Sequence, residues 1–230
     1  MVYSVSSDPD HPYNADQLHR YLMQFTLANR DAIWTTYLHN RDDQGTSMVR
    51  LIDWAKSDED KSYLSGTSRL LAAKALAWLF TSTNIAFRDS ATKAMVVLLE
   101  NNVTTIKKLL SEFETVNDPY VYERIFAAAY GAVLRSDKLE GLTELSQYIV
   151  ETIFKKDEVY ANILVRDYAR NIVEYAAYKK LYADDIKIVR PPYKSAFPSV
   201  FPNNAEIDAY KYDYQSKEFK DYYWGQNAIL

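Results

Sequence analysis

Three stretches of the chain are imperfect copies of one helical block. They are residues 87–94 (FRDSATKA), 121–128 (VYERIFAA) and 165–172 (VRDYARNI). Each copy has an acidic third residue, followed two and five positions later by apolar or small residues, which gives one apolar stripe on a helix. The copies start 34 and then 44 residues apart, which brackets the length of HEAT and armadillo repeats. The sequence therefore predicts an all-α fold, a HEAT/armadillo-like stack of helical hairpins.

Hydrophobic periodicity and capping residues divide the chain into two parts. Residues 1–180 should form the α-helical solenoid, with residues 1–60 as a divergent first hairpin region. Residues 181–230 should form a Pro/Tyr-rich strap and a truncated C-terminal segment. We expect Asn14 and Asp118 to cap helices, and Thr67 or Ser68 to cap a deeply buried one. The expected helices span residues 14–25, 31–38, 46–55, 67–80, 85–99, 103–113, 118–134, 139–154 and 161–178.

The last 50 residues differ in composition from the rest. Four of the seven prolines lie between residues 191 and 202, and proline excludes a regular helix there. Seven of the 20 tyrosines lie between Tyr182 and Tyr223, so this segment should strap across the helices. The apolar end, Ile229 and Leu230, suggests a fragment of a longer polypeptide.

Composition excludes several kinds of site. The five glycines are scattered, whereas a phosphate-binding loop needs two or three close together, so we expect no nucleotide cofactor. The chain has no cysteine, which excludes disulfides, thiolate zinc sites and cysteine nucleophiles. No apolar run approaches the ~20 residues that cross a bilayer, and the start is polar rather than an export signal. These features predict a cytoplasmic chain without membrane contact.

The titratable residues do not form a recognisable catalytic or metal site. His11, His19 and His39 lack the four-residue spacing of a helical metal site. The acidic residues of the three copies occupy equivalent positions, which favours a structural ladder between neighbouring helices over acid–base catalysis. The ladder would join Asp89, Glu123 and Asp167 to Arg88, Arg124, Arg166 or Arg170. We therefore expect this segment to have no enzymatic activity, no cofactor and no metal.

Basic side chains and tyrosines are the candidate binding residues. If the copies are the second helices of their hairpins, their cations line the inner surface of the stack, and exposed tyrosines make good binding anchors. The net charge is −4, and a small basic excess in residues 61–115 does not make the basic stripe that nucleic acid requires. A protein partner is therefore expected. The candidate residues are Arg88, Lys93, Arg124, Arg166, Arg170, Tyr193, Tyr212 and Tyr214.

Several ordered blocks resemble a known family. The segments are residues 71–84 with 87–94, then 118–124, 165–170 and 191–193. Together they resemble the C-terminal helical-repeat region of large bacterial STAND/NACHT-like ATPases linked to antiphage defence, over about residues 68–225. The resemblance implies an N-terminal effector, a central nucleotide-binding module and a C-terminal helical sensor that recognises a viral protein. This chain would be part of the sensor.

Two other functions remain open from the sequence. The chain could be a freestanding HEAT-like adaptor that binds host proteins. It could also be a helical-repeat DNA-binding enzyme of the DNA-glycosylase type, which would need a strongly basic groove and catalytic aromatic and acidic residues. The sequence does not name the partner, and it does not show whether residues 1–60 join the same stack.

Overall fold

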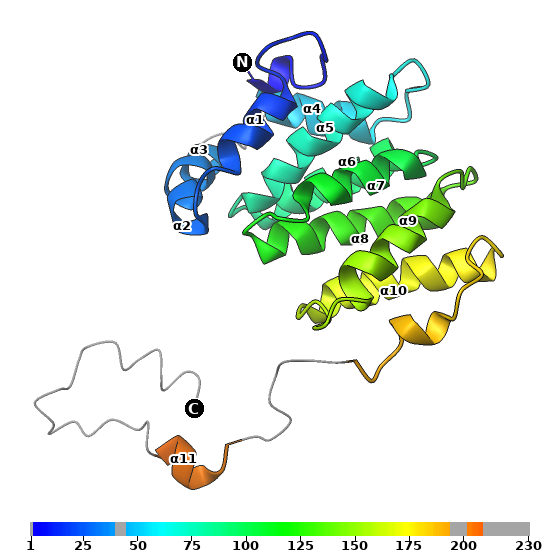
Figure 1. Cartoon of the computed structure of the whole chain (residues 1–230). Helices are drawn as coiled ribbons and strands as arrows, with labels where there is room; N and C mark the ends of the chain where they lie inside the picture. Colours follow the sequence, from blue (N-terminus) through cyan, green and yellow to red (C-terminus); the bar gives the residue numbers. More distant parts are fainter. Residues whose placement is uncertain (1, 40–44, 194–201, 209–230) are drawn as a thin grey trace, which may run out of the picture. The chain divides into compact units, whose positions relative to one another are not determined.

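The protein is all-α in a computed structural model that describes residues 2–39, 45–193 and 202–208 (Figure 1). No strand occurs within these ranges, so the predicted fold class is confirmed at this level. The chain divides into a large unit, Met1–Lys194, and a small unit, Ser195–Leu230. In the small unit the described residues form one short helix, α11 (Asn204–Asp208).

The large unit is built from helices joined by short loops. Single π-helical turns link α2 to α3 (Asp31–Thr35) and extend α9 (Val150–Phe154), and 3-10 turns occur at Val2–Ser4, Leu79–Thr81 and Ile186–Val189. The α-helices are α1 (Ala15–Leu22), α2 (Leu27–Arg30), α3 (Thr36–His39), α4 (Ser47–Lys56), α5 (Gly66–Trp78), α6 (Ile85–Leu99), α7 (Val103–Phe113), α8 (Pro119–Arg135), α9 (Leu142–Ile149) and α10 (Ile163–Tyr178).

Asparagine and aspartate start the three long helices that carry the copied block. The side chains of Asn84, Asp118 and Asn162 accept backbone N–H groups at the starts of α6, α8 and α10. Each cap lies three residues before its copy, so the helix start is repeated along with the stripe. Asn14 caps α1 as predicted.

The predicted cap of α5 is wrong. Ser65, not Thr67 or Ser68, caps this helix, and its hydroxyl accepts the backbone N–H of Ser68 at 3.0 Å. Ser65 has the extended backbone that a capping residue needs, with φ −62° and ψ 154°. Gly66, which carries no side chain, then begins the helix.

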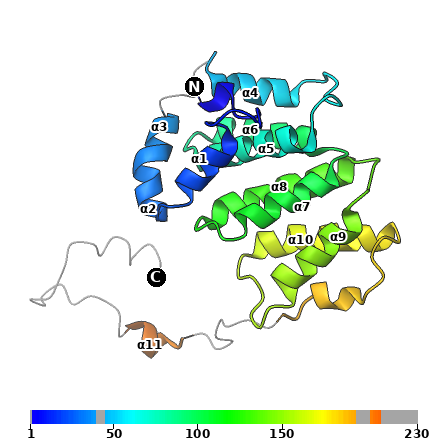
Figure 2. The same cartoon turned by 45° about the horizontal axis from the view of Figure 1, so that its top comes forward.

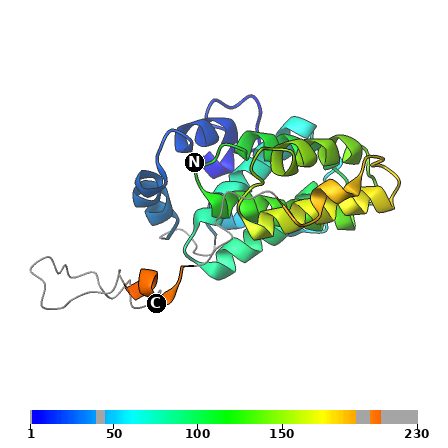
Figure 3. The ribbon, with the colours of Figure 1, turned by 60° about the horizontal axis from the view of Figure 1, so that its bottom comes forward.

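The helices of the large unit pack in two rows (Figures 1 and 2). One row contains α1, α5, α7 and α9, and the other contains α4, α6, α8 and α10. Each row packs on the other through one continuous apolar core. In Figure 3 the end of the unit that carries α9 and α10 comes forward. Since α1 packs on α5 and α4 packs on α6, residues 1–60 belong to the same packed unit.

Helices α6 and α8 run side by side in the same direction. Near their starts Arg124 of α8 forms an ion pair with Asp89 of α6. Near their ends Arg135 Nε lies 2.8 Å from Glu100 Oε2. Asp89 and Glu100 are 11 residues apart, and so are Arg124 and Arg135. This equal spacing fixes the parallel direction and the register of the two helices.

Helix α10 continues this arrangement beside α8. Asn162, at the start of α10, donates from Nδ2 to Glu123 Oε2 at 2.8 Å. Further along, the rings of Tyr130 and Tyr168 lie 6.2 Å apart. The N-terminal ends of α6, α8 and α10 therefore lie along one edge of the unit.

A small residue sets the distance between α6 and α8. A Cβ atom added at Gly131 would lie 3.1 Å from Val96 Cγ2, closer than ordinary van der Waals contact. The small side chains of Ala128 and Ala129 on the same helix are buried. This run of small residues therefore lets α8 pack closely on α6.

Buried Arg30 joins the N-terminal region to the middle of the chain. Its Nη1 donates to Asn117 Oδ1 at 2.5 Å, and its Nη2 lies 3.2 Å from Asp118 Oδ2. The guanidinium also lies 5.3 Å from the ring centroid of Trp78. Trp34 Nε1 donates to the carbonyl of Trp78 at 3.0 Å. One side chain of α2 thus connects α5 with the cap of α8.

We predict that Arg30→Ala lowers the free energy of unfolding by about 3 kcal/mol or more, because it leaves the cap carboxylate of Asp118 buried without its partner. Urea denaturation measures the change. The matched control is Arg20→Ala, since exposed Arg20 donates only to Gln17 of its own helix, and it should change stability by about 0.5 kcal/mol or less. Equal effects of the two variants would contradict this role for Arg30.

Candidate functional site

The five cations expected to bind a partner lie on one row of helices. Arg88 and Lys93 lie on α6, Arg124 lies on α8, and Arg166 and Arg170 lie on α10. Lys93 is exposed and the four arginines are half-buried. The structure thus places the sequence-predicted cations on three neighbouring helices, α6, α8 and α10.

Of the three tyrosines predicted to bind a partner, the structure describes Tyr193. Tyr193 is half-buried against the large unit, and its hydroxyl donates to the carbonyl of Val189 at 2.8 Å. Its ring lies 5.8 Å from that of Phe154. Tyr212 and Tyr214 lie outside the described residues. Tyr193 therefore attaches the end of the large unit to its helices.

Arg88 and Arg166 occupy the same position in their copies and make the same kind of contact. Arg88 Nη1 donates to the carbonyl of Ser82 at 2.7 Å. Arg166 Nη1 donates to the carbonyls of Tyr160 and Ala161 at 2.7 and 2.9 Å. Each arginine therefore fixes the loop that precedes its own helix, so these donors are used within the protein.

A tyrosine covers each of these two arginines. The guanidinium of Arg88 lies 5.3 Å from the ring of Tyr120, and that of Arg166 lies 5.3 Å from the ring of Tyr193. Both tyrosines directly follow a proline. Tyr120, the second residue of α8, therefore covers an arginine of α6, and Tyr193 covers an arginine of α10 in the same way. Such cation–π contacts contribute about 0.5–2 kcal/mol each.

The predicted ladder of ion pairs is right for one pair of helices only. Arg124 joins Asp89 across α8 and α6, as expected. Asp167 pairs with Arg170 of its own helix, and Glu123 accepts a hydrogen bond from Asn162 rather than from an arginine of α10. The reason is that Tyr168 holds in α10 the position that Arg124 holds in α8. At the contact between α8 and α10 an aromatic ring therefore takes the place of the cation.

The ion pair between α6 and α8 changes the acidity of Asp89. The hydrogen bond from Arg124 is the main cause that holds the pKa of the Asp89 carboxyl below its usual value. The positive charges of Lys93 and Arg88 act in the same direction. The exposed Asp89 carboxyl is therefore ionised near neutral pH, where it pairs with Arg124 across the two helices.

We predict that Arg124→Met raises the pKa of Asp89, because the hydrogen bond to its charged form is lost. An NMR titration of the side-chain carboxyl carbon measures the change. Lys93→Met is the matched control and should raise the pKa by less, since Lys93 acts on Asp89 only through its charge. An unchanged pKa in Arg124→Met would contradict the ion pair.

A buried polar cluster lies between α1, α5 and α7. Lys74 is buried within α5 and forms ion pairs with Asp16 of α1 and Glu112 of α7. His19 packs beside it, with Trp78 Nε1 donating to His19 Nδ1 at 3.3 Å. The sequence gives one signal for this cluster, which is the charge of Lys74 in an otherwise apolar run at residues 70–80. The arrangement binds three helices together.

Burial and the nearby ammonium of Lys74 lower the pKa of His19 to about 4. His19 is therefore neutral in the folded protein at pH 7, while its pKa in the unfolded chain is about 6.5. The unfolded chain binds the extra proton between these two values, so stability rises with pH across that window. The backbone of Glu112 and the charge of Asp16 oppose the shift without cancelling it.

We predict that lowering the pH from 7 to 5 costs the protein about 1 kcal/mol through His19, allowing for the part of the ring that water reaches. His19→Gln should show a flatter stability profile between pH 7 and pH 5. Urea denaturation at several pH values measures the difference between the two proteins. Parallel profiles would show that His19 is not the titrating group.

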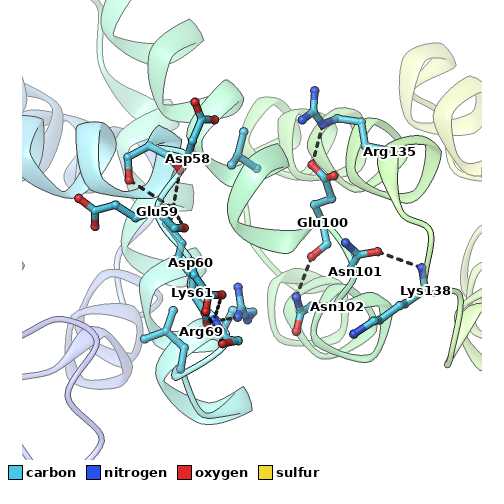
Figure 4. Close-up of a pocket in the computed structure, with 14 residues that line it drawn as sticks. Asp58, Glu59, Asp60, Lys61, Arg69, Glu100, Asn101, Asn102, Arg135 and Lys138 are labelled. Atoms are coloured by element: carbon cyan, nitrogen blue, oxygen red, sulfur yellow. Dashed lines mark hydrogen bonds and ion pairs between the residues drawn. The ribbon is translucent and has the colours of Figure 1, made fainter.

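An open polar groove lies at the other ends of the helices (Figure 4). It has a volume of about 590 Å³, and exposed Asp58, Glu59 and Asp60 line one wall. Glu100 and Arg135, which pair with one another, line the opposite wall. The acidic run Asp58, Glu59 and Asp60 is exposed, as a solvated loop between α4 and α5. The groove sits between three loops that join the two rows.

Buried side chains hold the acidic wall of this groove. Lys61 Nζ donates to the carbonyls of Ser57 and Glu59 at 2.6 and 3.2 Å. Arg69 donates to the carbonyls of Lys61 and Leu98, both at 2.7 Å. These cations stabilise the loop backbone that forms the acidic wall of the groove.

The described residues contain no group of three or more histidine, aspartate or glutamate side chains placed to hold a metal ion. Among these residues, no helix has the length and apolar character that crossing a membrane requires. No protein-family model, curated protein or solved structure matches the chain. The function is therefore argued from the geometry of the helices and their surfaces.

Proposed function

We propose that this chain is a HEAT-like stack of helical hairpins that recognises another protein or serves as a scaffold. The observation that supports this function best is the parallel, in-register row of α6, α8 and α10. Equivalent helices that repeat side by side form a continuous surface, and repeat proteins use such surfaces to bind macromolecules. In this reading α5–α6, α7–α8 and α9–α10 are successive hairpins of the solenoid.

The arginines support a rigid surface rather than a set of free binding groups. Arg88 and Arg166 anchor loops, and Arg124 joins two helices. A surface that is already ordered loses little conformational entropy when a partner binds. Lys93, which is exposed on α6, is the cation of this face best placed to meet a partner.

The partner class follows from charge. Acidic Asp89, Glu123 and Asp167 lie among the cations of this row. A DNA-binding surface needs an excess of cations that neutralise phosphates, and this mixture of signs does not supply one. The mixed face suits a protein with its own mixture of charges and apolar groups.

The resemblance to antiphage ATPases extends this proposal. In that setting the chain is part of the C-terminal sensor of a larger cytoplasmic protein, and the partner is a viral protein. Binding would displace stacked helices as rigid elements and pass the signal to the rest of the polypeptide. The ATPase and effector activities would belong to other parts of that polypeptide.

We predict that the 230-residue chain, used as bait, captures a phage-encoded protein from phage-infected bacterial lysate and not from uninfected lysate. Lys93→Glu should reduce the capture about tenfold, because it reverses a charge on the binding face. The matched control, Lys108→Glu, reverses an exposed charge on α7 of the other row and should leave the capture unchanged. Mass spectrometry gives the readout.

The other outcomes separate the alternatives. Host proteins captured from both lysates would favour the freestanding adaptor. Retention of DNA that falls steeply with added salt would favour the DNA-binding enzyme. Capture of no protein would contradict recognition by this segment.

A further inference from the structure

Exposed apolar side chains repeat at the first two positions of the three parallel helices. Ile85 is 65% exposed and Ile163 is 70% exposed. The core begins at the third residue of each helix, which is buried Phe87, Val121 or Val165. Ile85, Ile163 and Leu164 are therefore not buried within the unit, whereas Tyr120 also covers Arg88. The set, called the apolar edge below, is Ile85, Ala86, Pro119, Tyr120, Ile163 and Leu164.

Contacts between the first turns place these residues along one edge. Arg124 joins α8 to Asp89 of α6, and Asn162 joins the start of α10 to Glu123 of α8. In Figure 1 the three helices begin on the same side of the large unit. Exposed apolar side chains that gather at one edge of a protein often mark a site of interaction.

The short helices α2 and α3 pack at the same end of the unit. Arg30 reaches Asn117 in the loop before α8, and His39 Nδ1 lies 3.3 Å from Thr83 Oγ1 in the loop before α6. Leu27 of α2 and Ile33 of the π-helical turn between α2 and α3 are 41% and 52% exposed. This end of the unit therefore carries exposed apolar groups from α2, the π-helical turn and the starts of α6, α8 and α10.

The electrostatics of the apolar edge are positive. Helix N-termini carry partial positive charge, and acidic side chains in the first turn usually balance it. None of α6, α8 and α10 has an acidic residue in its first turn. The caps Asn84 and Asn162 are neutral, and the charge of Asp118 is paired with buried Arg30. Arg88 and Arg166, whose guanidinium groups donate to backbone carbonyls, add positive charge near the starts of α6 and α10, whereas the charge of Arg124 is paired with Asp89.

We propose that the apolar edge binds an amphipathic helix of a partner protein whose apolar face is flanked by acidic side chains. The apolar face would cover the isoleucine, leucine and tyrosine side chains, and the carboxylates would face the three helix starts. A helix flanked by lysines would meet the same apolar groups but the wrong charge. This inference rests on the proposed function and names the chemical class of the partner.

The test uses two labelled model peptides of about 18 residues, each with leucines at helical spacing on one face. One carries glutamates beside the leucines and the other carries lysines at the same positions. Fluorescence anisotropy measures their binding to the full chain. The acidic peptide should bind about tenfold more tightly or better, and its affinity should fall as salt rises from about 50 to about 500 mM.

A matched pair of variants locates the site. Ile85→Ser/Ile163→Ser/Leu164→Ser changes exposed side chains of the apolar edge and should weaken the acidic peptide about tenfold or more. Leu134→Ser/Tyr178→Ser changes exposed apolar side chains at the opposite ends of α8 and α10, at 45% and 78%, and should leave binding unchanged. Circular dichroism checks that both variants fold.

The inference is overturned if both peptides bind equally, if neither binds, or if the edge variant binds as the unchanged chain does. Its failure is distinguishable from failure of the proposed function. A protein captured equally well by the edge variant and the unchanged chain would leave the proposed function standing and remove the apolar edge as the site. Capture of nothing, with selective binding of the acidic peptide, would remove the proposed function alone.

Discussion

The parallel packing of α6, α8 and α10 determines where the other features of the molecule lie. Because each helix starts with an Asn or Asp cap three residues before the same block, equivalent turns meet across the row. Gly131 lets α8 approach Val96 of α6 closely, and this approach brings Arg124 to Asp89. A different register would separate these pairs and scatter the apolar groups at the helix starts. The surface properties therefore follow from one packing relation.

The charged residues of the row hold its loops and helices in place. Arg88 and Arg166 each close a loop and lie beneath a tyrosine that follows a proline. In α10 that tyrosine is Tyr193, which follows α10 in the chain and packs back on Arg166. Recognition through rigid helices is consistent with contacts that hold the loops as well as the helices.

Local features of the sequence were predicted well, because helix caps and apolar stripes depend on neighbouring residues. The bounds of α6 and α7 agree with the expected 85–99 and 103–113. Long-range contacts could not be predicted in the same way. Arg30 and Asp118 are 88 residues apart, and nothing in their local sequences marks them as partners. The ladder was wrong at α10 because a copy can keep its acidic residue while Tyr168 replaces the cation. The apolar edge could have been predicted from the sequence, because an apolar pair of residues follows each of the three helix caps.

The most direct test of the register is a disulfide between α6 and α8. The chain has no cysteine of its own, and a Cβ atom at Gly131 would lie 4.0 Å from Val96 Cβ, within the range of about 3.5–4.5 Å found in disulfides. Val96→Cys/Gly131→Cys should oxidise to an intramolecular disulfide with an unchanged circular dichroism spectrum. Val96→Cys/Leu134→Cys, displaced by about one turn, should stay reduced. A disulfide in the displaced pair, or none in the first, would contradict the parallel register.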